Sequence, residues 1–165
     1  MTSRWPALAG TVAMAALALG TGASNAVAAT GTGGYEDLSV VCAPNTANVC
    51  AHLQELPPDF TTDPVTVPQI RGQGTADAGD GITIVQVTLT KNMNGAGGSS
   101  STVVASTTQV TTSGSQLTAT TPAPQELCGY KITSIYYTAT VQYQVGTGPV
   151  QTVTASGGGN DCFPF

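Results

Sequence analysis

Charged side chains are scarce in this sequence. Lysine and arginine together number 4 and aspartate and glutamate 9, so only 8% of the 165 residues are charged. Nucleic acids and anionic lipid headgroups are bound through clusters of basic side chains, which so few residues do not provide. The composition therefore argues against nucleic acid and charged membrane surfaces as partners, and it favours a surface wetted by hydroxyl and amide groups.

Histidine and tryptophan are almost missing as well. His52 is the only histidine and Trp5 the only tryptophan. A serine or cysteine hydrolase needs a nucleophile held against a base, but no serine lies in a G-x-S-x-G motif. The acidic residues show no spacing that would fix two carboxylates across a cleft, as glycoside hydrolysis requires. We therefore expect no enzymatic activity and no cofactor, with His52 a surface or helix-cap residue.

Long hydrophobic runs are confined to the N-terminus. A short basic start is followed by an apolar run over residues 5–19 and by Ala-Val-Ala at 26–28, a cleavage pattern of the A-x-A type. The run is too short for a membrane-spanning helix, and a proline and a glycine interrupt it. Residues 1–28 are predicted to be a secretory signal peptide, with cleavage after Ala29 as an alternative. We expect a secreted, extracellular protein of bacterial origin, without a membrane anchor after cleavage.

Removal of residues 1–28 leaves 137 residues, enough for one domain with a hydrophobic core. Three basic residues then stand against nine acidic ones, a formal net charge of −6. We expect residues 29–34, which are rich in glycine, to form a flexible lead-in. Residues 35–165 are predicted to fold as a single domain.

Four cysteines remain in the exported chain, an even number that predicts disulfides in an oxidising compartment. Of the three pairings, we favour Cys42–Cys50, which closes a short local loop, together with Cys128–Cys162, which ties the long hairpin to the end of the chain. Loop entropy predicts about 2.5 kcal/mol of stabilisation from the first bridge and about 4 kcal/mol from the second. A zinc site is disfavoured because neither pair has C-x-x-C spacing and only one histidine exists.

The strongest structural signal is a strict alternation within residues 130–145. From Ile135 to Val145 the odd positions are mostly apolar and the even positions mostly polar. The odd positions are Ile135, Tyr137, Ala139, Val141, Tyr143 and Val145, and the even ones are Tyr136, Thr138, Thr140, Gln142 and Gln144. Period-2 alternation rich in β-branched and aromatic residues predicts a strand with one buried and one wet face.

Other segments suit strands that pair with this one. The expected strands cover residues 35–42, 65–73, 82–93, 102–112, 116–121 and 150–156, besides the long one. Pro68 interrupts the second of these, which predicts an edge position or a bulge, and the apolar phase slips between Ile84 and Val85, which predicts a bulge or burial on both faces. Turns are expected at 77–81, 113–114 and 146–149, and a mobile loop at 94–100. About seven antiparallel strands at these intervals predict an all-β sandwich of the immunoglobulin or fibronectin type, with a barrel as the alternative.

One stretch shows helical spacing instead. Asn45 suits a helix cap, Val49, Leu53 and Leu56 recur at about 3.6 residues, and two prolines at 57–58 would end the helix. We therefore expect one short helix over residues 45–56.

Two candidate ligand sites are suggested by single residues. Asp77 and Asp80, in D-A-G-D-G, could chelate calcium with backbone carbonyls, and Asp63 could join them, although a plain turn is the preferred interpretation. Tyr136 is the main aromatic residue on a polar strand face, and with Lys131 it could form part of a contact patch. A neighbouring loop that covers this tyrosine is the preferred alternative.

The disulfide loop is a further candidate contact. Asn45, Thr46 and Asn48 lie between Cys42 and Cys50, and a loop held rigid by a bridge can enter a protease cleft at low entropic cost. A staple under the expected helix is the simpler interpretation. We therefore expect a non-catalytic extracellular domain that acts by protein–protein contact, as an adaptor or structural subunit. It would attach by strand addition at the lead-in or the proline-marked strand, and inhibition of a secreted hydrolase is the alternative.

Overall fold

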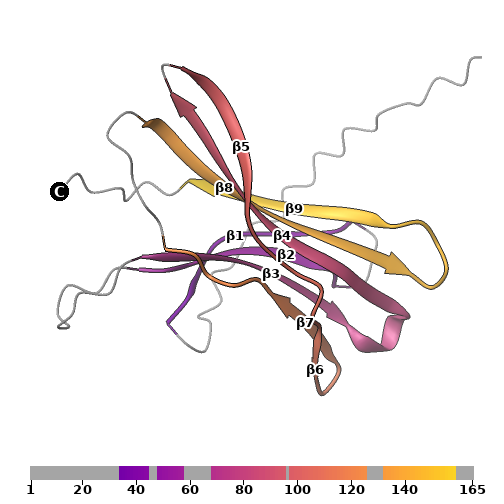
Figure 1. The fold of residues 1–165 in the computed structure, drawn as a ribbon. Coiled ribbons are helices and arrows are strands. Elements are labelled where there is room, and N and C mark those ends of the chain that lie inside the picture. The colour runs from indigo at the N-terminus through magenta and orange to yellow at the C-terminus, as the bar shows by residue number, and fades with distance from the viewer. Residues whose placement is uncertain (1–33, 45–47, 58–67, 96, 126–131, 159–165) are drawn as a thin grey trace, which may run out of the picture.

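The computed structural model describes residues 34–44, 48–57, 68–95, 97–125 and 132–158 (Figure 1). Within them lie nine strands and one 3-10 turn, η1 (Ala78–Asp80). The strands are β1 (Glu36–Cys42), β2 (Cys50–Leu56), β3 (Gln69–Asp77), β4 (Ile82–Gly95), β5 (Gly98–Thr107), β6 (Thr111–Ser113), β7 (Gln116–Thr120), β8 (Ile132–Val145) and β9 (Gln151–Gly158). The all-β prediction is confirmed.

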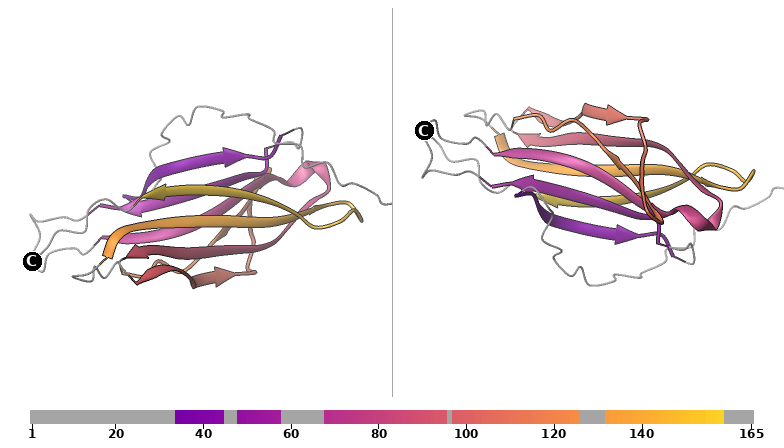
Figure 2. Two further views of the ribbon diagram at one scale, coloured as in Figure 1. Left: turned by 90° about the horizontal axis from the view of Figure 1, so that it is seen from above. Right: turned by 90° about the horizontal axis from the view of Figure 1, so that it is seen from below.

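The strands form two antiparallel sheets. One has the order β1-β2-β3-β7-β6 and the other β5-β4-β8-β9. The sheets face each other, with β9 against β1 and β2, β8 against β2 and β3, and β4 against β3 and β7. Figure 2 shows that most strands of the two sheets run in a similar direction, which is the aligned form of sheet packing.

The long alternating strand is confirmed as β8. Its odd residues from Ile135 to Tyr143 are buried, whereas Tyr136 is exposed and Val145, at the end of the strand, is 38% exposed. The predicted phase slip in residues 82–93 is also confirmed, because the register between β4 and β8 shifts between Ile84 and Gln86. The expected turns at 77–81 and 146–149 are present, and the turn expected at 113–114 lies at 114–115, between β6 and β7.

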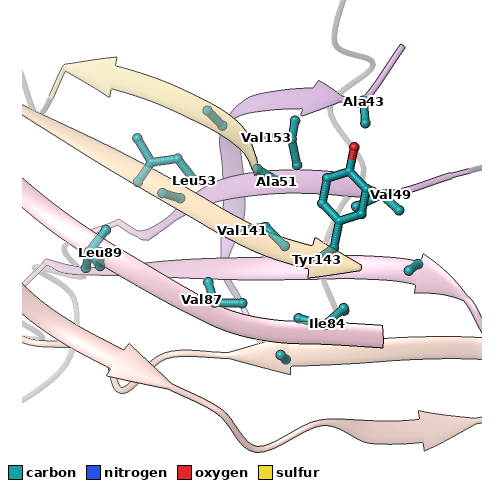
Figure 3. Packing of buried hydrophobic residues seen from close by; sticks show 14 of the residues in the cluster. Ala43, Val49, Ala51, Leu53, Ile84, Val87, Leu89, Val141, Tyr143 and Val153 are labelled. Atoms are coloured by element: carbon teal, nitrogen blue, oxygen red, sulfur yellow. The ribbon is translucent and has the colours of Figure 1, made fainter. Parts of the chain in front are cut away.

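The core lies between the sheets and combines small with large side chains. β3 contributes Gly72 and Gly74, and β4 and β8 contribute the larger Val87 and Val141, which approach Gly74 closely. Figure 3 shows buried side chains of both sheets meeting in this layer. A branched side chain on one sheet therefore fills the space that a glycine leaves on the other.

The helix expected over residues 45–56 is wrong. Residues Cys50–Leu56 form strand β2, which pairs with β1 on one side and β3 on the other. Val49, Leu53 and Leu56 fit a helical repeat, but Val49, Ala51 and Leu53 fit a strand repeat equally well, and these last three are fully buried. An apolar pattern this short does not distinguish a helix from a strand. Pairing with β1 and β3 on either side stabilises the strand.

The position expected for the proline-marked strand is also wrong. β3 begins at Gln69, directly after Pro68, and lies between β2 and β7 rather than at an edge. Proline has no N–H to donate, so the ladder starts with the residue that follows it. Residues 65–67 lie outside the described part of the chain.

One expected strand is divided between the sheets. The run over 102–112 ends as β5 at Thr107 and resumes as β6 at Thr111 in the other sheet. The Thr107 hydroxyl accepts a hydrogen bond from the Gln109 N–H at 3.1 Å, a turn that directs the chain away from β4. Where a loop is expected at 94–100, β4 continues to Gly95 and β5 begins at Gly98, and these two glycines pair.

Candidate functional site

A connected group of polar side chains lies on the outer face of the first sheet. His52 on β2 contacts two neighbouring strands: its Nδ1 lies 3.3 Å from Asp37 Oδ1 and its Nε2 lies 3.1 Å from Thr75 Oγ1. Gln54 Nε2 donates to the same Asp37 oxygen at 2.9 Å, and Arg71 Nε donates to Gln54 Oε1 at 2.8 Å. These five residues, from β1, β2 and β3, are called the Asp37 cluster below.

The cluster is largely withdrawn from water. The Asp37 side chain is only 3% exposed, and the His52 side chain is 17% exposed. Burial lowers the pKa of the Arg71 guanidinium, while Tyr35 and Asp37 oppose this effect, and the guanidinium stacks 3.7 Å above the Tyr35 ring. A buried carboxylate is stable when donors surround it, as His52 and Gln54 do here.

The contacts from Asp37 to His52 and from His52 to Thr75 join a carboxylate, an imidazole and a hydroxyl, as in the catalytic triad of a hydrolase. Acyl transfer also needs backbone N–H groups aimed at the developing oxyanion. Thr75 lies inside a central strand, paired with Cys50 on one side and Thr118 on the other, so its own backbone belongs to the ladders. The geometry suits a set of hydrogen bonds that ties three strands together. His52 lies in strand β2, not at the helix cap that the sequence suggested.

The predicted Cys42–Cys50 bridge is present. The two cysteines face each other across the β1–β2 ladder with Cα atoms 4.0 Å apart. Asn48, with a φ of 57°, donates a side-chain hydrogen bond to Asp77 at the end of β3. The loop is thus anchored at its base and at its exit, whereas Asn45 and Thr46 lie outside the described residues, as do Cys128 and Cys162.

The D-A-G-D-G segment forms a turn. Asp77 ends β3, Asp80 lies exposed in η1, and Gly81 adopts a φ of 64°. Among the described residues, no group of three or more His, Cys, Asp or Glu side chains could hold a metal. Asp63 and Lys131, the other residues considered for the calcium site and the contact patch, lie outside the described residues.

The outer face of the second sheet has a different character, and we call it the hydroxyl face. Two rows of three threonine or serine residues, and a third row with two glutamines, cross β4, β8 and β9 in matched register. The rows are Thr90, Thr138 and Ser156, then Thr88, Thr140 and Thr154, and next to them Gln86, Gln142 and Thr152. The even positions predicted to be wet on the long strand are thus the centre of a four-stranded polar surface.

Hydrogen bonds run across this face from strand to strand. Ser101 Oγ donates to Asn92 Oδ1 at 2.7 Å, and Asn92 Nδ2 donates to Thr138 Oγ1 at 3.1 Å. The Thr138 and Ser156 hydroxyls lie 3.3 Å apart, and those of Thr140 and Thr154 lie 3.4 Å apart. These hydrogen bonds hold the side chains in fixed positions across the strands.

Charge is excluded from the hydroxyl face. Within the bounds of β4, β5, β8 and β9, Lys91 is the only charged residue, and its register opposite the buried Tyr137 assigns it to the inner face. Tyr136, 40% exposed, stands at one corner of the hydroxyl face and Val103, 60% exposed, at its β5 border.

Sequence reasoning missed both surfaces as units. The Asp37 cluster joins residues 15 to 23 positions apart through His52, and no local pattern announces such contacts. The hydroxyl face did leave a signal, the T-x-T repeats at 88–90, 138–140 and 152–154, but their common register depends on the strand order.

Across the described residues, no helix is both long and apolar enough to cross a membrane. Comparison with protein-family models, curated proteins and solved structures found no match to this chain.

Proposed function

We propose that this chain is a secreted, non-catalytic domain with the strand order of the immunoglobulin class, acting through contact with another extracellular protein as an adaptor or structural subunit. The order β2-β3-β7-β6 corresponds to strands A-B-E-D of that class, and β4-β8-β9 to strands C-F-G. β1 and β5 would then be additional edge strands. This correspondence supports the finer fold assignment.

The observation that carries the contact function is the free edge of β5. This strand is ten residues long and contains no proline and no charged residue, and within the described part of the chain it pairs only with β4. Natural proteins usually protect such an edge with charge, proline or brevity, because it can accept a further strand. Val103, on this strand, adds an exposed apolar side chain.

The other three edges differ from β5. β1 carries Glu36 and Asp37 and is tied by the disulfide, β6 has only three residues, and β9 lies against β1 of the opposite sheet. The partner that β5 suits is therefore an extended, uncharged segment of another extracellular protein, which would add main-chain hydrogen bonds to the sheet. This edge replaces the proline-marked strand as the attachment point.

Thr102→Glu tests the proposal. The new carboxylate would sit on the β5 edge opposite Lys91, so it charges the edge without like-charge repulsion inside the sheet. We expect at least about a tenfold loss of the companion protein that co-purifies with the exported chain, or about 1.4 kcal/mol of binding energy. Thr147→Glu, in the exposed β8–β9 turn, is the control and should retain it. A lone monomer from the wild type, or full retention by Thr102→Glu, would exclude contact through β5.

Inhibition of a secreted protease is the second candidate, favoured by the double anchoring of the Cys42–Cys50 loop through the bridge and the Asn48–Asp77 hydrogen bond. An inhibitor would titrate such a protease to zero activity, whereas an adaptor would leave the rate unchanged.

A further inference from the structure

We propose that the hydroxyl face of the β5-β4-β8-β9 sheet binds a neutral polysaccharide, a role separate from protein contact through the β5 edge. Thr138, Thr140 and Thr154 form the centre of this site, and Tyr136 forms one corner.

The absence of charged side chains on this face favours an uncharged ligand. Its described side chains are hydroxyls and amides apart from Tyr136 and Val103, and Lys91 belongs to the inner face. Nucleic acids, anionic lipids and acidic polymers are held by basic groups, which this face does not present. A ligand charged of either sign would lose water here without gaining an opposite charge.

The hydrogen-bonding capacity matches that of sugar hydroxyls. Each threonine hydroxyl has one hydrogen to donate and two lone pairs to accept with. The mutual bond between Thr140 and Thr154 uses one of their two hydrogens, so one hydrogen and several lone pairs stay open. Because neighbouring strands fix these hydroxyls, little side-chain entropy is lost when a ligand binds.

The hydroxyls recur along and across several strands, and such an extended array favours a polymer. Equivalent hydroxyls recur at about 6.6–6.8 Å along each strand and about 4.7–4.9 Å between strands. Small ligands usually need a concave site that surrounds them. A polysaccharide chain can instead make many weak, repeated contacts along an open surface, and together these give useful affinity.

Tyr136 supplies the one aromatic surface. Its register partner on β9 is Gly158, which has no side chain to cover the ring from that side, and its partner on β4 is Asn92. An exposed tyrosine offers a flat apolar ring with a polar tip, which can pack on the apolar face of a sugar ring. By contrast, the centres of protein interfaces are enriched in several aromatic and arginine anchors, and this face has a single one.

The test is depletion of the exported chain from solution by insoluble cellulose, chitin and amylose, each as a separate probe. We expect at least one probe to remove the protein, with an affinity that changes little with salt because no charge is involved. Tyr136→Ala should weaken this binding about threefold to tenfold, the range expected for one aromatic contact. Thr154→Lys, which brings a charge to the centre of the site, should weaken it by at least as much.

The matched control is Thr112→Lys, an exposed threonine on β6 of the other sheet, which should bind as the wild type does. Thr102→Glu should also bind normally, so this proposal and the protein-contact proposal fail separately. Failure of all three probes to remove the wild type would overturn the inference. Equal binding by Tyr136→Ala, Thr154→Lys and the control would do the same, as would binding only to an anionic polymer such as alginate, reversed by salt.

Discussion

At the scale of single residues, the closest contacts between the sheets depend on glycine. A Cβ atom at Gly74 would lie 3.0 Å from both methyl groups of Val141 and 3.0 Å from Val87 Cγ2. These valines are fully buried, so they have little room to move. Gly74 is needed for the space that it leaves, not for an unusual backbone angle.

Gly74→Ala is therefore expected to destabilise the fold by about 1–3 kcal/mol, the usual cost of overpacking a filled core. Gly79→Ala is the control, because a Cβ in that turn meets nothing within 4 Å. Urea unfolding followed by circular dichroism measures both variants. A Gly74→Ala protein as stable as the control would show that the sheets can move apart at no cost.

The face of each residue on a long strand could be predicted, but its partners could not. Alternation alone assigned Tyr137 and Val141 to the core and Thr138 to water, because the side chains of a strand alternate strictly. Nothing near His52 in the sequence indicates Asp37 or Thr75, since these contacts arise only after three strands are in register. These contacts depend on the order of the strands in the sheet, which composition does not encode.

At the scale of elements, predictions succeeded where the alternation was long and failed where side chains were small or the run was short. β3 buries Gly72, Gly74 and Ala76, residues that carry almost no hydrophobic signal, so its central position was not foreseen. The apolar residues in and next to β2 are so few that they fit both a helical repeat and a strand repeat. Its identity depends on ladders with β1 and β3, which are long-range contacts.

The Cys42–Cys50 bridge acts on one element in particular, the edge strand β1. Cys42→Ser combined with Cys50→Ser should lower the free energy of unfolding by about 2.5 kcal/mol, from the entropy regained by the unfolded loop. Because β1 pairs with β2 alone among the described strands, its amides should also exchange faster with solvent, whereas those of β8, paired on both sides, should exchange only with global unfolding. Hydrogen exchange resolves the two strands. Unchanged protection of β1 in the double variant would mean that the ladder alone holds this edge.

At the scale of the whole molecule, the two sheets divide polar chemistry between them. The strands of the first sheet carry five charged residues, and hydrogen bonds hold Asp37, Arg71 and Asp77 among them in place. The second sheet carries Lys91 as its one charged residue and presents hydroxyl groups outward. Both contacts proposed above, the β5 edge and the hydroxyl face, therefore belong to the second sheet.

The β8–β9 hairpin also bears on the second bridge. Its ladder includes Tyr136 opposite Gly158, so the start of β8 and the end of β9 lie at the same end of the hairpin. Cys128 and Cys162 lie outside the described residues, and the bridge expected between them would add about 4 kcal/mol by loop closure. Non-reducing peptide mapping of the protein taken from the culture supernatant should recover these two cysteines in one linked peptide pair, with the chain starting at Ala29. Reactive thiols at either position, or a chain that still begins at Met1, would contradict export through an oxidising compartment.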